Sequence, residues 1–93
     1  MYKEGDVLVL ENDWRGEWCV FILYRIKNED WMEAHAKYSF AFSKLGIGAG
    51  NTSTNIKYST GYLREATDDE KDYLLDMLNN NGYSYDFKLN RLL

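Results

Sequence analysis

The feature that most constrains the fold is an apolar run near the start of the chain, in GEWCVFILYRI (residues 16–26). In a strand, successive side chains point to opposite faces. One face of this run carries Trp18, Val20, Ile22, Tyr24 and Ile26, and the other carries Cys19, Phe21 and Leu23. Its β-branched and aromatic content favours a strand over a helix. Because both faces are apolar, we expect a strand that the rest of the chain covers on both sides.

Further segments are expected to pair with this strand. The other strand-like segments are residues 7–10, 31–45 and 56–65. We interpret residues 31–45 as a single strand because the preceding KNED (27–30) is typical of a hairpin turn, although MEAHAK within it also favours a helix. Residues 46–55 contain three glycines. We expect them to form a mobile loop, which in a small domain is either functional or disordered.

The C-terminal part of the chain predicts a capped helix over residues of about 67–81. Thr67 and Glu70 have the spacing of a capping box, and residues 68–69 place negative charge in the first turn, where the helix dipole favours it. The apolar stripe that helical spacing predicts consists of Tyr73, Leu74, Met77 and Leu78. Gly82 is suited to the left-handed conformation that ends a helix.

After the helix, aromatic or apolar residues alternate with polar ones over residues 83–89, which predicts a short half-buried strand. The expected class is therefore α+β: a small, strongly bent antiparallel sheet of about five strands, with one helix near the C-terminus. A chain of 93 residues is long enough for one domain and too short for two. We expect a single domain, residues 1–93, with a β part at 1–64 and a helix–strand clasp at 65–93.

Two stretches resemble a group of small uncharacterised proteins from gut bacteria, their phages and mobile elements. They are YKEGDVLVLENDWRGEWCVFILYRI (residues 2–26) and ATDDEKDYLLDMLNNNGYSYD (residues 66–86). The chain departs from that pattern where it lacks a proline-containing middle stretch and has a Gly/Ser/Thr-rich loop instead. The resemblance implies an SH3-like β-barrel followed by the helix–strand clasp. It brings no assigned activity.

Charge and cysteine content limit the classes of function. Residues 1–64 carry eight basic and eight acidic side chains, and residues 65–93 carry three basic and seven acidic ones, which gives the net charge of −4. Direct nucleic-acid binding depends on a basic surface and is disfavoured. A single cysteine, Cys19, excludes an internal disulfide and fits a reducing compartment. The first residues lack the pattern of a signal peptide, and the longest apolar run, residues 19–24, is too short to span a bilayer. We expect a cytoplasmic protein.

Candidates for catalysis are scarce in this sequence. The chain has one histidine, His35, and one cysteine, Cys19, in separate predicted strands, and a zinc site needs more ligands than these two. Cys19 lies in the most apolar run, so we expect a buried structural thiol. GIGAG (residues 46–50) lacks the Lys-Ser/Thr ending of a phosphate-binding loop. We expect neither a cofactor nor an enzymatic activity.

Binding is the function class that the sequence favours. Four aromatic residues near predicted strand ends or loops are candidate contacts for a partner: Trp14, Trp31, Tyr58 and Tyr62. Three carboxylates share one helix face opposite Leu74, Met77 and Leu78, and they are Asp69, Asp72 and Asp76. The rings could instead plug the sheet, and the acidic face could simply be solvated.

We therefore expect a non-enzymatic interaction module for a protein or peptide partner, encoded on a mobile or phage-related element and present as a monomer or weak homodimer. The alternative is a small-molecule- or nucleotide-binding protein that uses the loop at 46–55 and nearby aromatics.

Overall fold

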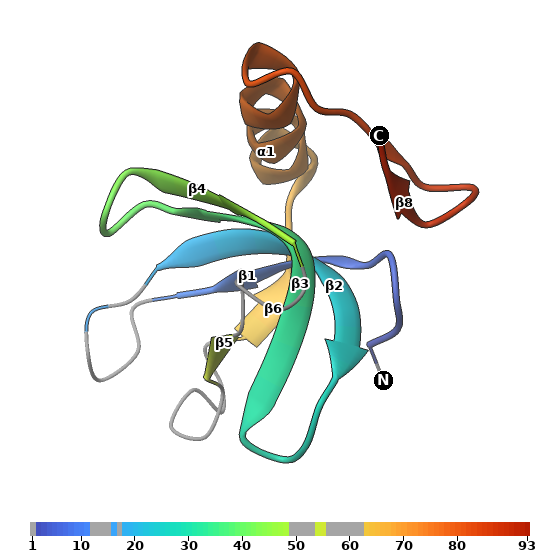
Figure 1. Ribbon diagram of the computed structural model, residues 1–93. Helices are drawn as coiled ribbons and strands as arrows, with labels where there is room; N and C mark the ends of the chain where they lie inside the picture. Colours follow the sequence, from blue (N-terminus) through green and yellow to red (C-terminus); the bar gives the residue numbers. More distant parts are fainter. Residues whose placement is uncertain (1, 12–15, 17, 49–53, 56–62) are drawn as a thin grey trace.

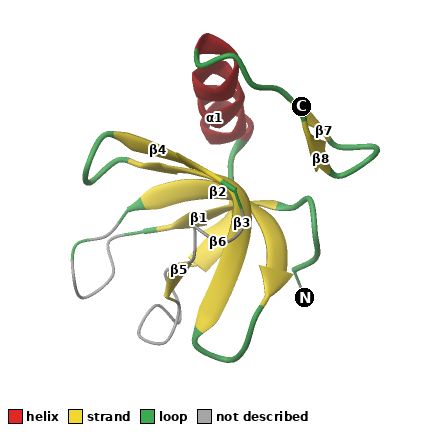
Figure 2. Ribbon diagram, in the orientation of Figure 1, coloured by secondary structure: helices red, strands yellow, loops and turns green. Residues whose placement is uncertain are grey.

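The computed structural model describes residues 2–11, 16, 18–48, 54–55 and 63–93 (Figure 1). Its elements in chain order are β1 (Val7–Leu10), β2 (Cys19–Ile26), β3 (Trp31–Ser39), β4 (Lys44–Ile47), β5 (Thr54–Asn55), β6 (Leu63–Glu65), α1 (Asp68–Asn80), β7 (Tyr85–Asp86) and β8 (Arg91–Leu92). All strand pairs are antiparallel. Helix α1 covers one face of the sheet, and the hairpin β7–β8 lies beside the helix (Figure 2). The α+β class is confirmed.

The main sheet has the strand order β4-β3-β2-β1-β6, with β5 also paired to β3. Strands β1 and β6, the first and the last of this sheet in chain order, therefore lie side by side. Over the described residues the sheet has two ends, β4 and β6, which are four and three residues long. A barrel would need these end strands to pair with each other at a staggered register. They do not pair, so the SH3-like barrel that we expected is not closed, and the sheet is bent but open.

The central strands β2 and β3 contain adjacent β-bulges. Ile22 pairs with Ala36, and the next residue of β2, Leu23, pairs with Ala34, so His35 is an extra residue in β3. A bulge bends its strand and increases the local twist. Beyond this point the β3 side chains change face: Ala36 belongs to the cluster under α1, and Ala34 belongs to the cluster on the opposite face.

The second bulge restores the register between the two strands. Leu23 pairs with Ala34, and the next pair is Arg25 with Glu33, so Tyr24 is the extra residue in β2. Bulged residues point their side chains away from the regular pleat. The rings of Tyr24 and His35 meet edge to face, 5.0 Å between centroids.

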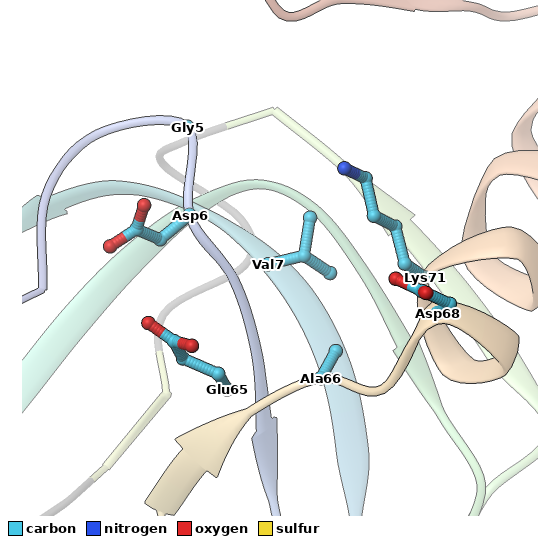
Figure 3. A pocket seen from close by; sticks show the side chains of 7 residues that line it. All are labelled: Gly5, Asp6, Val7, Glu65, Ala66, Asp68 and Lys71. Atoms are coloured by element: carbon cyan, nitrogen blue, oxygen red, sulfur yellow. The ribbon is translucent and has the colours of Figure 1, made fainter.

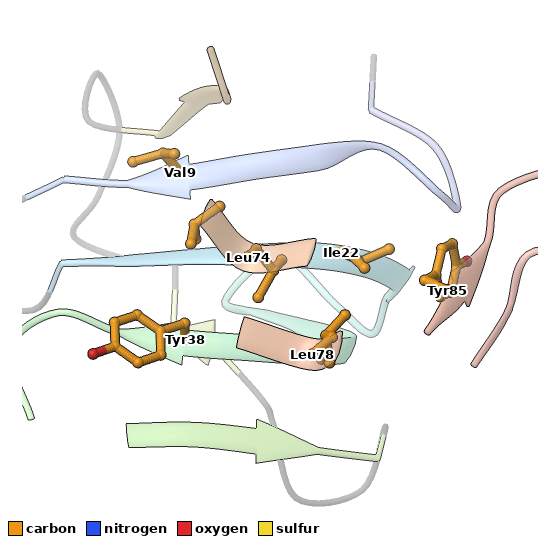
Figure 4. Packing of buried hydrophobic residues seen from close by; sticks show 8 residues of the cluster. Val9, Ile22, Tyr38, Leu74, Leu78 and Tyr85 are labelled. Atoms are coloured by element: carbon orange, nitrogen blue, oxygen red, sulfur yellow. The ribbon is translucent and has the colours of Figure 1, made fainter. Parts of the chain in front are cut away.

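The prediction that β2 is covered on both sides is confirmed, because its first five residues are buried on either face. The cluster under the helix consists of Val9, Val20, Ile22, Ala36, Tyr38, Leu74, Leu78 and Tyr85 (Figure 4). The cluster on the opposite face consists of Leu8, Leu10, Cys19, Phe21, Leu23, Met32 and Ala34. Tyr2 and Leu63 pack against this second cluster.

Both ends of α1 follow the sequence prediction. The Glu70 backbone N–H donates to Thr67 Oγ1 at 3.2 Å, and the Thr67 N–H donates to Glu70 Oε1 at 2.9 Å, which is the expected capping box. At the other end Gly82 has φ +84. Its N–H donates to the carbonyl of Asn79 at 3.1 Å, and the Tyr83 N–H donates to that of Leu78 at 2.9 Å. These two bonds form a Schellman motif, so the predicted stop is confirmed.

The segment 31–45 was predicted as one strand, and this prediction is wrong. Strand β3 ends at Ser39, and β4 begins at Lys44 and pairs back on it. The hydroxyl of Ser39 accepts the N–H of Phe42 at 3.3 Å, and Ser43 takes the left-handed region with φ 51. The turn is therefore built by serines, without the glycine or proline that usually marks one.

The predicted loop at 46–55 is shorter than expected at both ends. Residues 46–47 belong to β4 and residues 54–55 form β5, and residues 49–53 lie outside the described part of the chain. Of the strand predicted at 56–65, residues 63–65 form β6, and residues 56–62 lie outside the described part.

The strand predicted at 83–89 is also wrong in extent. Strand β7 covers only Tyr85–Asp86, and the chain turns back to form β8, so the module is a helix with a hairpin. The Asp86 carboxylate accepts the N–H groups of Lys88 and Leu89 at 2.9 and 3.1 Å, and Asn90 has φ 48. These Asx-type bonds and the left-handed asparagine direct the turn. Tyr85 alone of the alternating aromatics is buried.

Candidate binding surface

An exposed set of aromatic side chains lies where three segments meet, at the start of β2, the turn between β3 and β4, and the middle of α1. We call Trp18, Phe40, Phe42 and Tyr73 the aromatic ledge. The Phe40 N–H donates to the carbonyl of Trp18 at 2.8 Å, which extends the β2–β3 pairing by one step and holds the two segments together. Trp18 is 44% exposed, Tyr73 41% and Phe42 77%, and Phe40 is half-buried. The ledge thus combines residues far apart in the sequence.

Ring contacts connect the ledge to the core. The centroids of Trp18 and Phe40 are 4.7 Å apart, and those of Phe40 and Tyr73 are 5.4 Å apart. Beneath them, Tyr38 packs edge to face on Phe40 at 5.2 Å and on Tyr73 at 5.3 Å. Tyr38 is only 7% exposed and belongs to the cluster under α1. Trp18, Phe40 and Tyr73 therefore continue the core to the surface, because aromatic pairs at these separations attract one another.

The hydroxyl of Tyr38 also affects the chemistry of the ledge. A hydrogen bond with Tyr38, and secondly burial, raise the pKa of Tyr73 above its ordinary value. This hydrogen bond ties the exposed Tyr73 to the buried Tyr38.

Next to the ledge lies a row of carboxylates on α1. We call Asp69, Asp72 and Asp76 the acidic row, and all three side chains are exposed. Tyr73 follows Asp69 by four positions and precedes Asp76 by three, so these three side chains lie on the same side of the helix. The acidic row predicted from the sequence therefore borders the aromatic ledge, which the sequence did not predict.

The predicted aromatic contacts have different outcomes. Trp31 is 37% exposed, but it is the first residue of β3 and pairs with Asn55. It lies eight residues before Ser39, the last residue of β3, which places it roughly 25 Å along the strand from the ledge at about 3.3 Å per residue. The other three predicted residues, Trp14, Tyr58 and Tyr62, lie outside the described part of the chain.

From the sequence, each residue of the aromatic ledge was expected in a strand or a helix, and none was expected in a binding surface. Trp18 and Phe40 were placed within strands, and Tyr73 was placed in the apolar stripe of the helix. One signal could have identified Phe42: Tyr38, Phe40 and Phe42 alternate, so a continuous strand would have to bury three large rings on one face near its end.

An ionic cluster fixes the helix to the sheet. Arg64 of β6 makes two contacts to the Glu70 carboxylate, at 2.7 and 2.8 Å, and one to Glu11 Oε1 at 3.0 Å. The Arg64 guanidinium lowers the pKa of Glu70 to about 2, against the opposing effect of burial, and hydrogen bonds with Thr67 lower it further. Arg64 also lowers the pKa of Glu11. The cluster orients α1, and hence the ledge, on the sheet.

A shallow pocket of about 250 Å³ lies between the start of β1 and the first turn of α1 (Figure 3). Its lining residues are Gly5, Asp6, Val7, Glu65, Ala66, Asp68 and Lys71. Figure 3 shows Asp6 and Glu65 on one side of it and Asp68 with Lys71 on the other. The Lys71 ammonium lies 4.5 Å from the centroid of the Phe87 ring. Three carboxylates around one ammonium do not suit the phosphate of a nucleotide, and none of the described residues of the 46–55 loop lines this pocket.

The residues considered for catalysis lie on opposite faces of the sheet. The Cys19 side chain is buried in the cluster away from the helix. The His35 ring contacts Tyr24 and Tyr85, and its Nε2 lies 3.3 Å from Glu4 Oε2. Cys19 and His35 therefore do not form a nucleophile–base pair. Within the described ranges, no three residues among His, Cys, Asp and Glu cluster closely enough to hold a metal ion.

Comparisons of this chain with protein-family models, with curated proteins and with solved structures found no match. Helix α1 has 13 residues, and no helix in the described part of the chain has the length and apolar character needed to cross a membrane. The function of this protein must therefore be inferred from its own residues.

Proposed function

We propose that this protein is a non-enzymatic interaction module that binds a short segment of a partner protein across the aromatic ledge. The observation that carries the proposal is the exposure of Trp18 and Tyr73, at 44% and 41%, on either side of Phe40, together with Phe42, which is 77% exposed in the same β3–β4 turn as Phe40. Tryptophan and tyrosine dominate the residues that contribute most to protein binding. Exposed clusters of this kind are typical of interaction sites rather than of inert surface.

The support beneath the ledge strengthens the proposal. Phe40 and Tyr38 pack against the rings of Trp18 and Tyr73, so these two side chains lose little entropy when a partner binds. A pre-organised aromatic surface of this size suits an anchor side chain and its flanking residues. The Phe42 side chain lies in the β3–β4 turn and is 77% exposed, so it is accessible to a partner.

We place this module in the cytoplasm, because its single cysteine suits a reducing compartment. The net charge of −4 supports a protein partner over direct binding to nucleic acid.

The test is a selection from a display library of random peptides of about twelve residues, long enough to cross the ledge in extended form at about 3.3 Å per residue. The enriched peptides are then synthesised and titrated against two variants, Phe42→Ser and Leu89→Ser. These residues are both exposed, at 77% and 63%, but Leu89 lies in the C-terminal hairpin away from the ledge. We expect Phe42→Ser to weaken binding about tenfold or more and Leu89→Ser to leave it unchanged.

Because both positions are surface residues, neither variant should unfold, and circular dichroism confirms this. Failure to enrich any peptide, or equal losses in the two variants, would show that the aromatic ledge is not a binding surface.

A further inference from the structure

We infer that the segment bound by the aromatic ledge is cationic, with apolar side chains on the ledge and lysine or arginine side chains along the acidic row. This inference rests on the proposed function and names the partner's chemistry. Electrostatic complementarity selects among partners and speeds their encounter, while the apolar contacts supply most of the affinity.

The distribution of charge on α1 supports this chemistry. The helix carries one basic residue, Lys71, and its ammonium lies over the Phe87 ring, next to the C-terminal hairpin. Glu70 is already paired with Arg64. Asp69, Asp72 and Asp76 make no ion pair with a described residue, and Lys44, the first residue of β4 after the β3–β4 turn, is an exposed cation. Among the described residues, three negative charges against one leave this side of the molecule acidic.

The spacing of the carboxylates fits an extended segment. Asp72 and Asp76 are four residues apart on the helix, a rise of about 6 Å. In an extended chain, side chains on the same face are two residues apart, or about 6.6 Å. Two basic residues separated by one position can therefore lie over the two carboxylates at once. The Tyr73 ring lies beside these two carboxylates, because Tyr73 follows Asp72 by one residue and precedes Asp76 by three.

A second copy of this chain is a poor occupant for the same surface. In a two-fold dimer the same patch faces itself. Two acidic rows would then lie at one interface, and like charges brought together disfavour association. The net charge of −4 adds to this repulsion. The occupant that fits is a basic segment of a different protein.

The inference is tested with the peptides selected from the random library, by their composition and by a pair of charge-matched variants. The first variant is Asp72→Lys with Asp76→Lys, which reverses two charges of the acidic row. The control is Glu29→Lys with Asp30→Lys, which changes the net charge equally but in the turn between β2 and β3, away from the ledge. Asp69 is left unchanged because it stabilises the first turn of α1.

We expect the enriched peptides to be basic and to contain at least one aromatic or large aliphatic residue. Reversal of the acidic row should weaken their binding about tenfold at low salt, and the control should change it less than about twofold. Raising the salt from about 0.05 to 0.5 M should remove most of this difference, because exposed charges are screened.

Two results would overturn the inference. Enriched peptides that are neutral or acidic, and that lose affinity in Phe42→Ser but not in the acidic-row variant, leave the proposed function intact and exclude a cationic partner. Equal losses in the acidic-row variant and its control show a non-specific response to net charge. If no peptide depends on Phe42, the proposed function fails, and the inference fails with it.

Discussion

Truncating Leu74 should remove a large part of the stability of this domain. Its side chain is fully buried between α1 and the sheet. Leu74→Ala removes three carbon atoms, worth about 0.8 kcal/mol each by transfer, and leaves a cavity that raises the total cost to about 3 kcal/mol. A domain of 93 residues has a stability of roughly 5–14 kcal/mol. The loss is therefore between a fifth and more than half of the total.

Urea unfolding followed by tryptophan fluorescence and by circular dichroism measures this loss. With a urea dependence of about 1.5 kcal/mol per molar, a loss of 3 kcal/mol lowers the midpoint by about 2 M. The two signals should change together, because a small domain with a continuous core unfolds in one step. Leu74→Asp, which also buries a charge, should leave the domain unfolded in the absence of urea.

Leu89→Ala is the matched control for this experiment, since that side chain is 63% exposed and should cost less than about 0.5 kcal/mol. The role of α1 as a clasp is refuted if Leu74→Ala lowers the midpoint no more than the control does, or if Leu74→Asp keeps a cooperative unfolding transition.

The remaining stability predictions concern the two ends of α1. Because the pKa of Glu70 is lowered from 4.5 to about 2, its contribution is fully present above pH 4.5 and is lost as the pH falls towards 2. Since Arg64 is 36% exposed, solvent screening reduces this contribution to about 1 kcal/mol. Glu70→Gln should therefore destabilise the domain by about 1 kcal/mol at pH 7 and not at pH 2. Urea titrations at the two pH values measure this, and an equal loss of stability at both would contradict the prediction. Gly82→Ala should cost about 1 kcal/mol, because φ +84 strains an alanine although no atom lies within 4 Å of the added Cβ; an unchanged urea midpoint would exclude this strain.

The elements that the sequence predicted best are those that local signals specify completely. Thr67 and Glu70 cap one end of α1 and Gly82 the other, and these interactions lie within a few residues of one another. The strand at 19–26 was equally predictable, because a run that is apolar on both faces must lie inside the fold.

The two errors in the strands have a common physical cause. Aromatic alternation continues through residues 38–42 and through residues 83–89, so the pattern indicates a strand beyond the point where the backbone turns. In both places the turn depends on a side chain, of Ser39 or Asp86, that accepts backbone N–H hydrogen bonds. Each turn also contains a left-handed residue other than glycine, Ser43 or Asn90. Such turns are set by local side-chain hydrogen bonds, which an alternating pattern of aromatic residues does not reveal.

The aromatic ledge could not be predicted because no local pattern joins its members. The acidic row was predictable from helical spacing alone. Its position beside Trp18 and Phe40 depends on the pairing of β2 with β3 and on the placement of α1, and both follow from contacts between residues far apart in the sequence.

The most direct test of the binding surface compares two tryptophans with similar exposure, 44% for Trp18 and 37% for Trp31. Indole N–H signals in a two-dimensional ¹H–¹⁵N NMR spectrum, assigned with Trp18→Phe and Trp31→Phe, are followed during titration with a selected peptide. We predict that the Trp18 signal shifts to saturation and that the Trp31 signal stays in place. A shift of Trp31 with Trp18 unmoved would contradict the account, because the partner would then bind at the opposite end of β3.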